Sequence, residues 1–168
     1  MSAPERLSYD LVQVAPWRGD EAAFAERLRA AGWELPEFGH LWSAPGRLAC
    51  SVRPGRWLLA TEPTTSAPLG TLAASCEAAL GDAGAVTDLS SARASWRVTD
   101  PAARAWVAAG CRLDLDPAAF PVGRATVTLI SQVPVMLAAM PGAWLFMAPS
   151  SMAEHFEAWL QQAAGQGA

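Results

Sequence analysis

Apolar positions follow two periods along the chain, and the changes between them mark the expected elements. Apolar residues recur every three or four positions in four segments, which predicts helices at 20–31, 68–80, 101–109 and 150–160. Shorter segments alternate between apolar and polar residues and are bounded by Gly and Pro, which predicts strands at 47–52, 56–61, 85–89, 94–99, 124–131, 133–139 and 143–148. Residues 1–18 lack a strong period and are expected to be extended, and the Pro- and Gly-rich segment 33–46 is expected to be a loop.

Capping residues and apolar stripes refine the helices. Asp20 is expected to cap the first helix, and Asp100 followed by Pro101 is expected to begin the third. The predicted buried faces are, in chain order, Phe24, Leu28 and Ala31; then Leu69, Leu72, Ala73, Cys76 and Leu80; then Ala102, Ala105, Trp106 and Ala109; and last Met152, Phe156, Trp159 and Leu160.

The order of elements predicts an α+β fold, with antiparallel strands and helices on one face of each sheet. Residues 1–35 are interpreted as an N-terminal lead-in and helix. Residues 36–163 are interpreted as a single domain with two similar halves, about 36–90 and 91–163, although no sequence repeat is visible. The tail 164–168 is expected to fray.

Composition narrows the classes of function. The chain is 52% hydrophobic and 17% charged, so it can bury a sizeable core. A net charge of −4 argues against a nucleic-acid partner. All 12 basic residues are arginine, which excludes Schiff-base and phosphate-loop lysines. No apolar run is long enough for a membrane span and the N-terminus lacks a signal-peptide pattern, so no membrane association and a cytoplasmic location are expected.

The inventory for metal binding and covalent catalysis is thin. Cys50, Cys76 and Cys111 form no C-x-x-C pair and are expected to be buried free thiols. His40 and His155 lack ligand spacing, so no metal site is predicted. No serine or cysteine lies in a nucleophile motif, and no glycine-rich phosphate loop is present.

Two sets of polar residues leave alternatives open. Asp114 and Asp116 alternate with leucines, so they favour a solvated turn over acid-base chemistry. Asp88 ends a predicted strand and Arg93 follows just across the turn. We expect a structural ion pair between them, in preference to a ligand contact.

The chain has eight tryptophans, a residue that is enriched at protein interfaces. Trp42 and His40 lie in the expected loop 33–46, where an aromatic side chain has little core to reach. They are the predicted partner-interface residues.

Three motifs carry a resemblance to a known family. Asp88-Leu89-Ser90 resembles the opening of the folate-binding domain of aminomethyltransferases. The segment 110–120, GCRLDLDPAAF, resembles the G-C-x-L-D-L-x-P-x-x-F pattern of sarcosine oxidase gamma subunits, and 150–160 resembles that family's closing segment. The segment 131–137, SQVPVML, departs from the aminomethyltransferases because it lacks their pair of aspartates.

The resemblance implies a shortened, non-catalytic relative of the folate domain, built from two ferredoxin-like halves. Such a chain would be the gamma subunit of a heterotetrameric sarcosine oxidase, which demethylates sarcosine to glycine. It would bind no cofactor itself, while the alpha, beta and delta subunits would carry FAD, FMN, NAD, tetrahydrofolate and zinc. The chief contact would be with the folate-binding part of the alpha subunit. The alternatives are a stand-alone folate or small-molecule binding protein and a self-associating structural protein.

Overall fold

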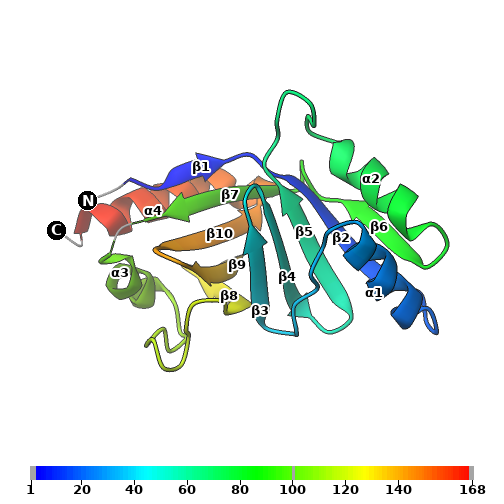
Figure 1. Ribbon diagram of the computed structural model, residues 1–168. Coiled ribbons are helices and arrows are strands. Elements are labelled where there is room, and N and C mark those ends of the chain that lie inside the picture. The colour runs from blue at the N-terminus through cyan, green and yellow to red at the C-terminus, as the bar shows by residue number, and fades with distance from the viewer. Residues whose placement is uncertain (1–2, 100, 167–168) are drawn as a thin grey trace. The chain divides into compact units, whose positions relative to one another are not determined.

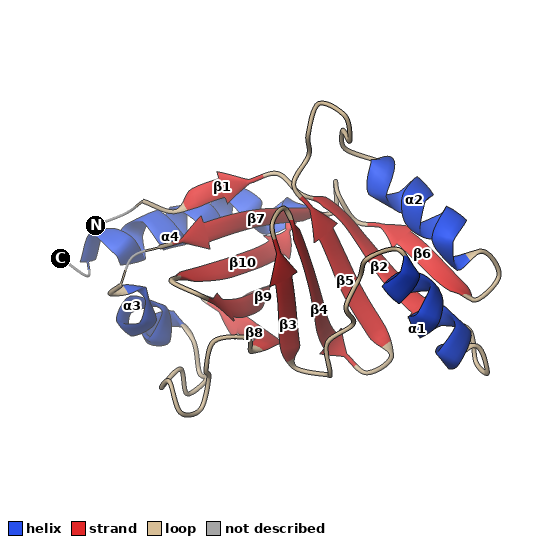
Figure 2. Ribbon diagram, viewed as in Figure 1, coloured by secondary structure: helices blue, strands red, loops and turns tan. Residues whose placement is uncertain are grey.

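The computed structural model describes residues 3–99 and 101–166 and contains two five-stranded antiparallel sheets with helices (Figures 1 and 2). The chain divides into two compact units. The N-unit is Ser8–Ser91, and the C-unit is Met1–Leu7 together with Ala92–Ala168. Among the described residues, no helix is long and apolar enough to cross a membrane.

The N-unit contains one sheet and two helices. In chain order its elements are β2 (Asp10–Pro16), α1 (Glu21–Ala30), β3 (His40–Ala44), β4 (Arg47–Arg53), β5 (Arg56–Thr61), α2 (Thr71–Leu80) and β6 (Gly84–Asp88). The strands lie in the order β3-β4-β5-β2-β6, so β2 is an inner strand. Val12 and Val14 of β2 share one core with Phe24 and Leu28 of α1.

The C-unit has a matching set of elements. They are β1 (Glu5–Leu7), β7 (Arg93–Val98), α3 (Ala103–Gly110), β8 (Ala125–Ile130), β9 (Val133–Met140), β10 (Ala143–Pro149), the short 3₁₀ turn η1 (Ser150–Met152) and α4 (Ala153–Gln166). The strand order is β8-β9-β10-β7-β1. Trp96 and Phe146 from the sheet and Phe156 from α4 are fully buried, and they pack in tilted and edge-to-face pairs.

The two units have the same connectivity. Each runs strand, helix, three strands, helix, and each has a fifth strand beside the first. In the N-unit that fifth strand is β6, whereas in the C-unit it is β1 from the start of the chain. The pattern is that of a ferredoxin-like unit with one extra edge strand, β3 or β8. The predicted α+β fold with two similar halves is therefore confirmed.

The structure divides the N-terminal part of the chain differently from the prediction. Residues 1–35 are not a separate lead-in, because β2 forms an inner strand and α1 covers the same sheet. The segment 33–46 is not all loop, because His40–Ala44 forms β3. Gly46 lies in the turn between β3 and β4 with a φ of 69°, so this glycine joins two strands and interrupts neither.

Two helix details also differ. Asp20 makes no side-chain capping bond; its backbone carbonyl instead accepts the Phe24 N–H at 2.8 Å. Leu69 precedes α2 and is 57% exposed, so it does not join the apolar stripe. The predicted cap Asp100 lies outside the described residues.

The predicted face of α3 was right for Trp106 and wrong for its alanines. The helix buries Ala103, Trp106 and Val107, because a large Val gains more from burial than Ala does, and Ala105 and Ala109 are exposed. At the other end of the chain, α4 continues through Gln166 and buries Ala164, so residues 164–166 do not fray.

Candidate functional site: two polar and apolar clusters at the motif residues

The Asp88-Leu89-Ser90 motif fixes the end of β6 to β2. The Ser90 hydroxyl donates to Oδ1 of Asp10 at 3.0 Å and accepts the Leu11 N–H at 3.0 Å. Oδ2 of Asp10 accepts the Leu72 N–H at 2.8 Å, in the first turn of α2. Asp10 is 1% exposed, so this carboxylate is buried and has two donors. Asp10 and Ser90 therefore connect β2 and the end of β6 to the N-terminus of α2, where a negative charge is favoured.

Sequence reasoning missed Asp10. The signal was a single acid inside the apolar run Tyr9-Asp10-Leu11-Val12, which predicts a buried, partnered carboxylate once the run is read as a strand. Asp88 itself is exposed, and its Oδ1 accepts the Ser90 N–H at 2.9 Å. This backbone hydrogen bond holds the pKa of Asp88 below its usual range.

The predicted ion pair between Asp88 and Arg93 stays a prediction. Asp88 ends β6 in the N-unit, and Arg93 begins β7 in the C-unit. The local bond from Ser90 already accounts for one oxygen of the Asp88 carboxylate.

The motif that begins at Gly110 forms a cap and a turn. Oδ1 of Asp114 accepts the Asp116 N–H at 2.9 Å, and Oδ1 of Asp116 accepts the Ala118 N–H at 2.9 Å. The carbonyl of Asp116 accepts the Phe120 N–H at 2.7 Å, and the Phe120 ring stacks on Trp144. One oxygen of each carboxylate therefore shapes the backbone, which confirms the solvated-turn interpretation.

Gly110 and Trp159 form the centre of an apolar groove between α3 and α4. A Cβ at Gly110 would lie 2.2 Å from Cζ2 of Trp159, so only glycine lets the indole approach this closely. A groove of about 490 Å³ lies here, and it is lined by Ala105, Trp106, Ala109, Gly110, Trp159, Gln162 and Ala163. The indole N–H of Trp106 is buried without an acceptor among the described residues.

The groove continues toward the turn between β8 and β9. A second hollow of about 630 Å³ shares Ala109, Gly110 and Trp159 with the first, and adds Arg112, Thr128, Leu129, Ser131 and Gln132. Ser131 and Gln132 both have positive φ, 48° and 68°, in a two-residue hairpin turn where Asn-Gly is usual. Left-handed backbone at two non-glycine residues costs on the order of 1–3 kcal/mol each, and the surrounding hairpin holds it in place.

The predicted interface residues lie on or beside β3. Trp42 is half-buried, packs against the N-unit core and meets Trp33 edge to face at 6.3 Å, so its ring mainly serves the core. His40 is half-buried, and its Nδ1 lies 3.2 Å from the Phe38 carbonyl. The most exposed aromatic ring of this segment is Phe38, at 59%. The role of His40 and Trp42 at an interface stays a prediction.

The three cysteine thiols are buried. Burial raises the pKa of Cys50 to about 12 and, with the Asp10 charge nearby as a smaller cause, that of Cys76 to about 11. Over the described ranges 3–99 and 101–166, no cluster of three His, Cys, Asp or Glu side chains could hold a metal ion.

The fold is shared with an aminomethyltransferase. Over 94% of this chain and 45% of that protein, it superimposes on the glycine cleavage system aminomethyltransferase T from Bartonella henselae with a TM-score of 0.68 and 14% identity. A likeness at this identity defines the class of fold and nothing further. No family model matches the chain.

Curated relatives and a solved complex define the family. The chain is 36% identical over 154 residues to the sarcosine oxidase subunit gamma of Corynebacterium sp. (strain P-1), covering 89% of this chain and 71% of the relative. It is 36% identical over 107 residues to that of Arthrobacter sp., covering 62% of this chain and 53% of the relative. It also superimposes on a chain of the heterotetrameric sarcosine oxidase from Corynebacterium sp. U-96, solved with pyrrole 2-carboxylate. There the TM-score is 0.83 at 27% identity, over 98% of this chain and 84% of that one. The chain belongs to the family of sarcosine oxidase gamma subunits.

Proposed function

We propose that this chain is a non-catalytic subunit of a heterotetrameric sarcosine oxidase, which oxidatively demethylates sarcosine to glycine. The observation that carries the proposal is the superposition of 98% of this chain on a chain of such a complex. The chain would support assembly and help to enclose the cavity on the folate side, chiefly through contact with the alpha subunit. Flavins, NAD, tetrahydrofolate and zinc would be held by the alpha, beta and delta subunits.

The side chains of the motifs support a structural role. Asp10, Asp114 and Asp116 each accept backbone N–H groups, so their oxygens hold turns and a helix start. The segment Ser131–Gln132, which departs from the aminomethyltransferase pattern, forms a hairpin turn without an acid. Proton transfer at a substrate nitrogen needs a carboxylate or imidazole within hydrogen-bond reach, whereas one oxygen of each of Asp88, Asp114 and Asp116 already accepts a backbone N–H.

Reconstitution tests the proposal. The alpha, beta and delta subunits are prepared with and without this chain, and two rates are measured: sarcosine consumption and methylene-tetrahydrofolate formation. We expect that omitting the chain lowers the yield of complex, or uncouples folate product from sarcosine oxidation. Unchanged yield and unchanged coupling would contradict the proposal. Titration calorimetry of the isolated chain with tetrahydrofolate addresses the stand-alone folate-binding alternative, which requires a measurable heat of binding.

A further inference from the structure

The strand β8 is a free edge of the C-unit sheet. Among the described residues, no other strand pairs along its outer side, and β8 is the last strand of its sheet (Figure 1). At the end nearest the turn, the isolated bridge between Cys111 and Ile130 and the bond from the Ser131 N–H to the Gly110 carbonyl meet that side. The strand has the sequence ATVTLI, and two of its apolar side chains are open to solvent, with Val127 46% and Leu129 60% exposed. Unpaired, uncharged edges with apolar side chains are strong sites for pairing with another chain, so soluble proteins normally protect them.

Two of the other three edge strands contain charged side chains, namely Glu5 and Arg6 in β1 and Asp88 in β6. The third, β3, has none, but its large side chains are half-buried. In β1 these charges are also paired, because Arg97 donates to Glu5 at 2.9 Å and Arg6 donates to Glu157 at 3.1 Å. β8 has neither a charge nor a proline, and of the four edge strands in the described ranges it alone exposes large apolar side chains.

The hydrogen-bond phase of β8 shows which peptide groups are available. Ala139 N–H donates to the Arg124 carbonyl at 2.9 Å, and in this register the even-numbered residues of β8 bond to β9. The N–H and C=O groups of Ala125, Val127 and Leu129 therefore point to the outer side. Ser131 is also odd-numbered, and its N–H donates to the Gly110 carbonyl at 3.0 Å on the outer side. This bond agrees with the outward direction of the odd-numbered peptide groups.

These outward groups specify an extended partner. Peptide donors and acceptors that recur at every second residue are satisfied by an adjacent strand, and not by a helix or a small molecule. The exposed Val127 and Leu129 would pack against alternate apolar side chains of that strand. Gly110 and Cys111 already cover the turn end, so the added strand would begin beside Ala125 and Val127 and end at the groove below Leu129.

We propose that β8 accepts an uncharged, extended segment of a neighbouring subunit as a sixth strand of the C-unit sheet. This inference rests on the proposed function, because the segment is taken to come from another subunit of the heterotetramer. A second copy of this chain is the competing occupant, and the oligomeric state measured below distinguishes it from another subunit.

Two substitutions at Val127 test the proposal. Val127→Pro removes an outward N–H without removing a bond to β9, and proline is accepted at such edge positions. Val127→Lys keeps the backbone and places a charge on the edge. The matched control is Val122→Lys, because Val122 is 58% exposed in the same unit but lies outside the strand. Thermal denaturation of each full-length variant establishes that it folds, and if the proline variant does not, the lysine variant carries the test.

Association of the full-length chain with the other three subunits is the measurement. We expect each Val127 variant to weaken it at least about tenfold, which is ~1.4 kcal/mol, while Val122→Lys binds like the wild type. Wild-type affinity in both Val127 variants would overturn the edge proposal alone. A wild-type chain that does not associate with the other subunits would overturn the proposed function as well. If sedimentation shows that the wild-type chain is a dimer and that Val127→Pro is a monomer, the strand that pairs with β8 comes from a second copy of this chain, and the proposal of another subunit is wrong.

Discussion

Replacing Gly110 by alanine should destabilise the protein, although alanine is the better helix former. Gly110 is the last residue of α3, and its backbone is not in the positive-φ region that glycine alone tolerates. The added Cβ would lie 2.2 Å from Cζ2 and 3.0 Å from Cε2 and Cη2 of Trp159. Carbon atoms pack at about 3.5–4.0 Å, so the indole would have to move by more than ~1 Å.

Two opposing terms set the magnitude. Overpacking of this kind costs about 1–3 kcal/mol, and the indole has little freedom to move because the Phe156 ring stacks on it at 5.8 Å. The higher helix propensity of alanine stabilises a helix interior by up to about 1 kcal/mol relative to glycine, and by less in the last turn. The contact is closer than an ordinary overpacked site, so we expect Gly110→Ala to lower the free energy of unfolding by about 1–2 kcal/mol.

Urea unfolding followed by tryptophan fluorescence measures this effect. The control is Gly165→Ala in the last turn of α4, where a Cβ meets nothing within 4 Å and should be neutral or mildly stabilising. The double variant with Trp159→Ala isolates the contact, because Gly110→Ala should no longer destabilise once the indole is gone. Equal effects of Gly110→Ala with and without Trp159 would refute the reasoning.

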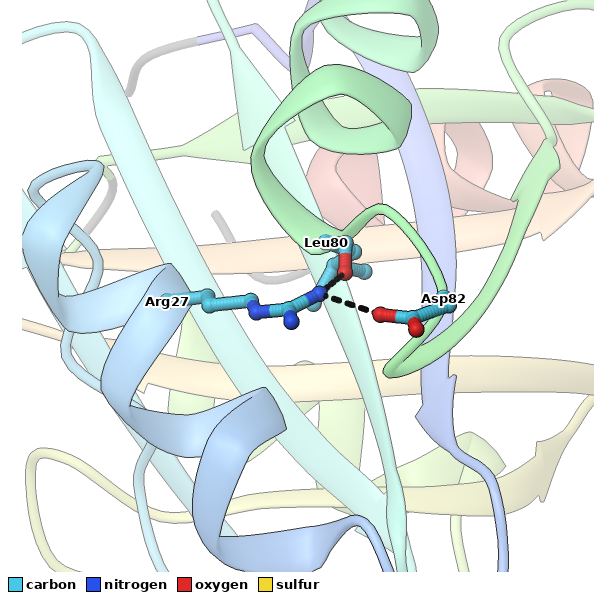
Figure 3. Close-up of polar contacts among 3 residues, drawn as sticks. All are labelled: Arg27, Leu80 and Asp82. Carbon is cyan, nitrogen blue, oxygen red and sulfur yellow. Dashed lines mark hydrogen bonds and ion pairs between the residues drawn. The ribbon is translucent and has the colours of Figure 1, made fainter.

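Three further predictions concern the N-unit. In Asp10→Asn, an amide NH₂ group replaces one of the two oxygens that accept the Leu72 N–H and the Ser90 hydroxyl. Urea unfolding should therefore show a free energy of unfolding lower by about 1–3 kcal/mol, and a smaller decrease for Asp88→Asn. Arg27 donates to the Leu80 carbonyl and to Asp82 at 2.9 Å (Figure 3), and this bond holds the pKa of Asp82 below its ordinary value of 3.8. Stability from a lowered carboxyl pKa is present above 3.8 and is lost as the pH falls through the lowered value, so Arg27→Leu should raise the Asp82 pKa toward 3.8 in a carboxyl NMR titration. With their pKa raised to about 12 and about 11, Cys50 and Cys76 should resist thiol reagents at pH 8 until the chain unfolds, and fast labelling of both in the folded protein would contradict the burial argument.

Local patterns predicted the hairpins and the helices that have strong periodicity. Arg53-Pro54-Gly55 marks the turn between β4 and β5, and Gly55 takes the positive φ of 67° that such a turn needs. Phe24 and Leu28 of α1 were placed on the buried face because large side chains dominate that helix. In α3 the same reasoning failed, because alanine is too weakly apolar to set a face and the contact between Gly110 and Trp159 depends on α4, far along the chain.

The N-terminal strands could not be predicted because their partners are distant in sequence. Leu11 and Val12 pair with residues near Ala60 and Asp88, and Glu5 pairs with Arg97. A strand of three residues, such as β1, has no period to detect. Its role is clear only from its position in the sheet: β1 lies beside β7 in the C-unit, as β6 lies beside β2 in the N-unit. The similarity of the halves therefore lies in connectivity, which a search for sequence repeats does not detect.

The motif residues that link this chain to its family are now explained by local geometry. Ser90 fastens β6 to the buried Asp10, the two aspartates after Gly110 close consecutive turns, and Gly110 admits the indole of Trp159. Each of these contacts joins segments far apart in the sequence or fixes a turn between them, so each would be selected for the scaffold whatever the scaffold carried. The motifs therefore account for the scaffold, and the feature of the described surface that they leave unexplained is an uncharged edge strand, β8, beside an apolar groove.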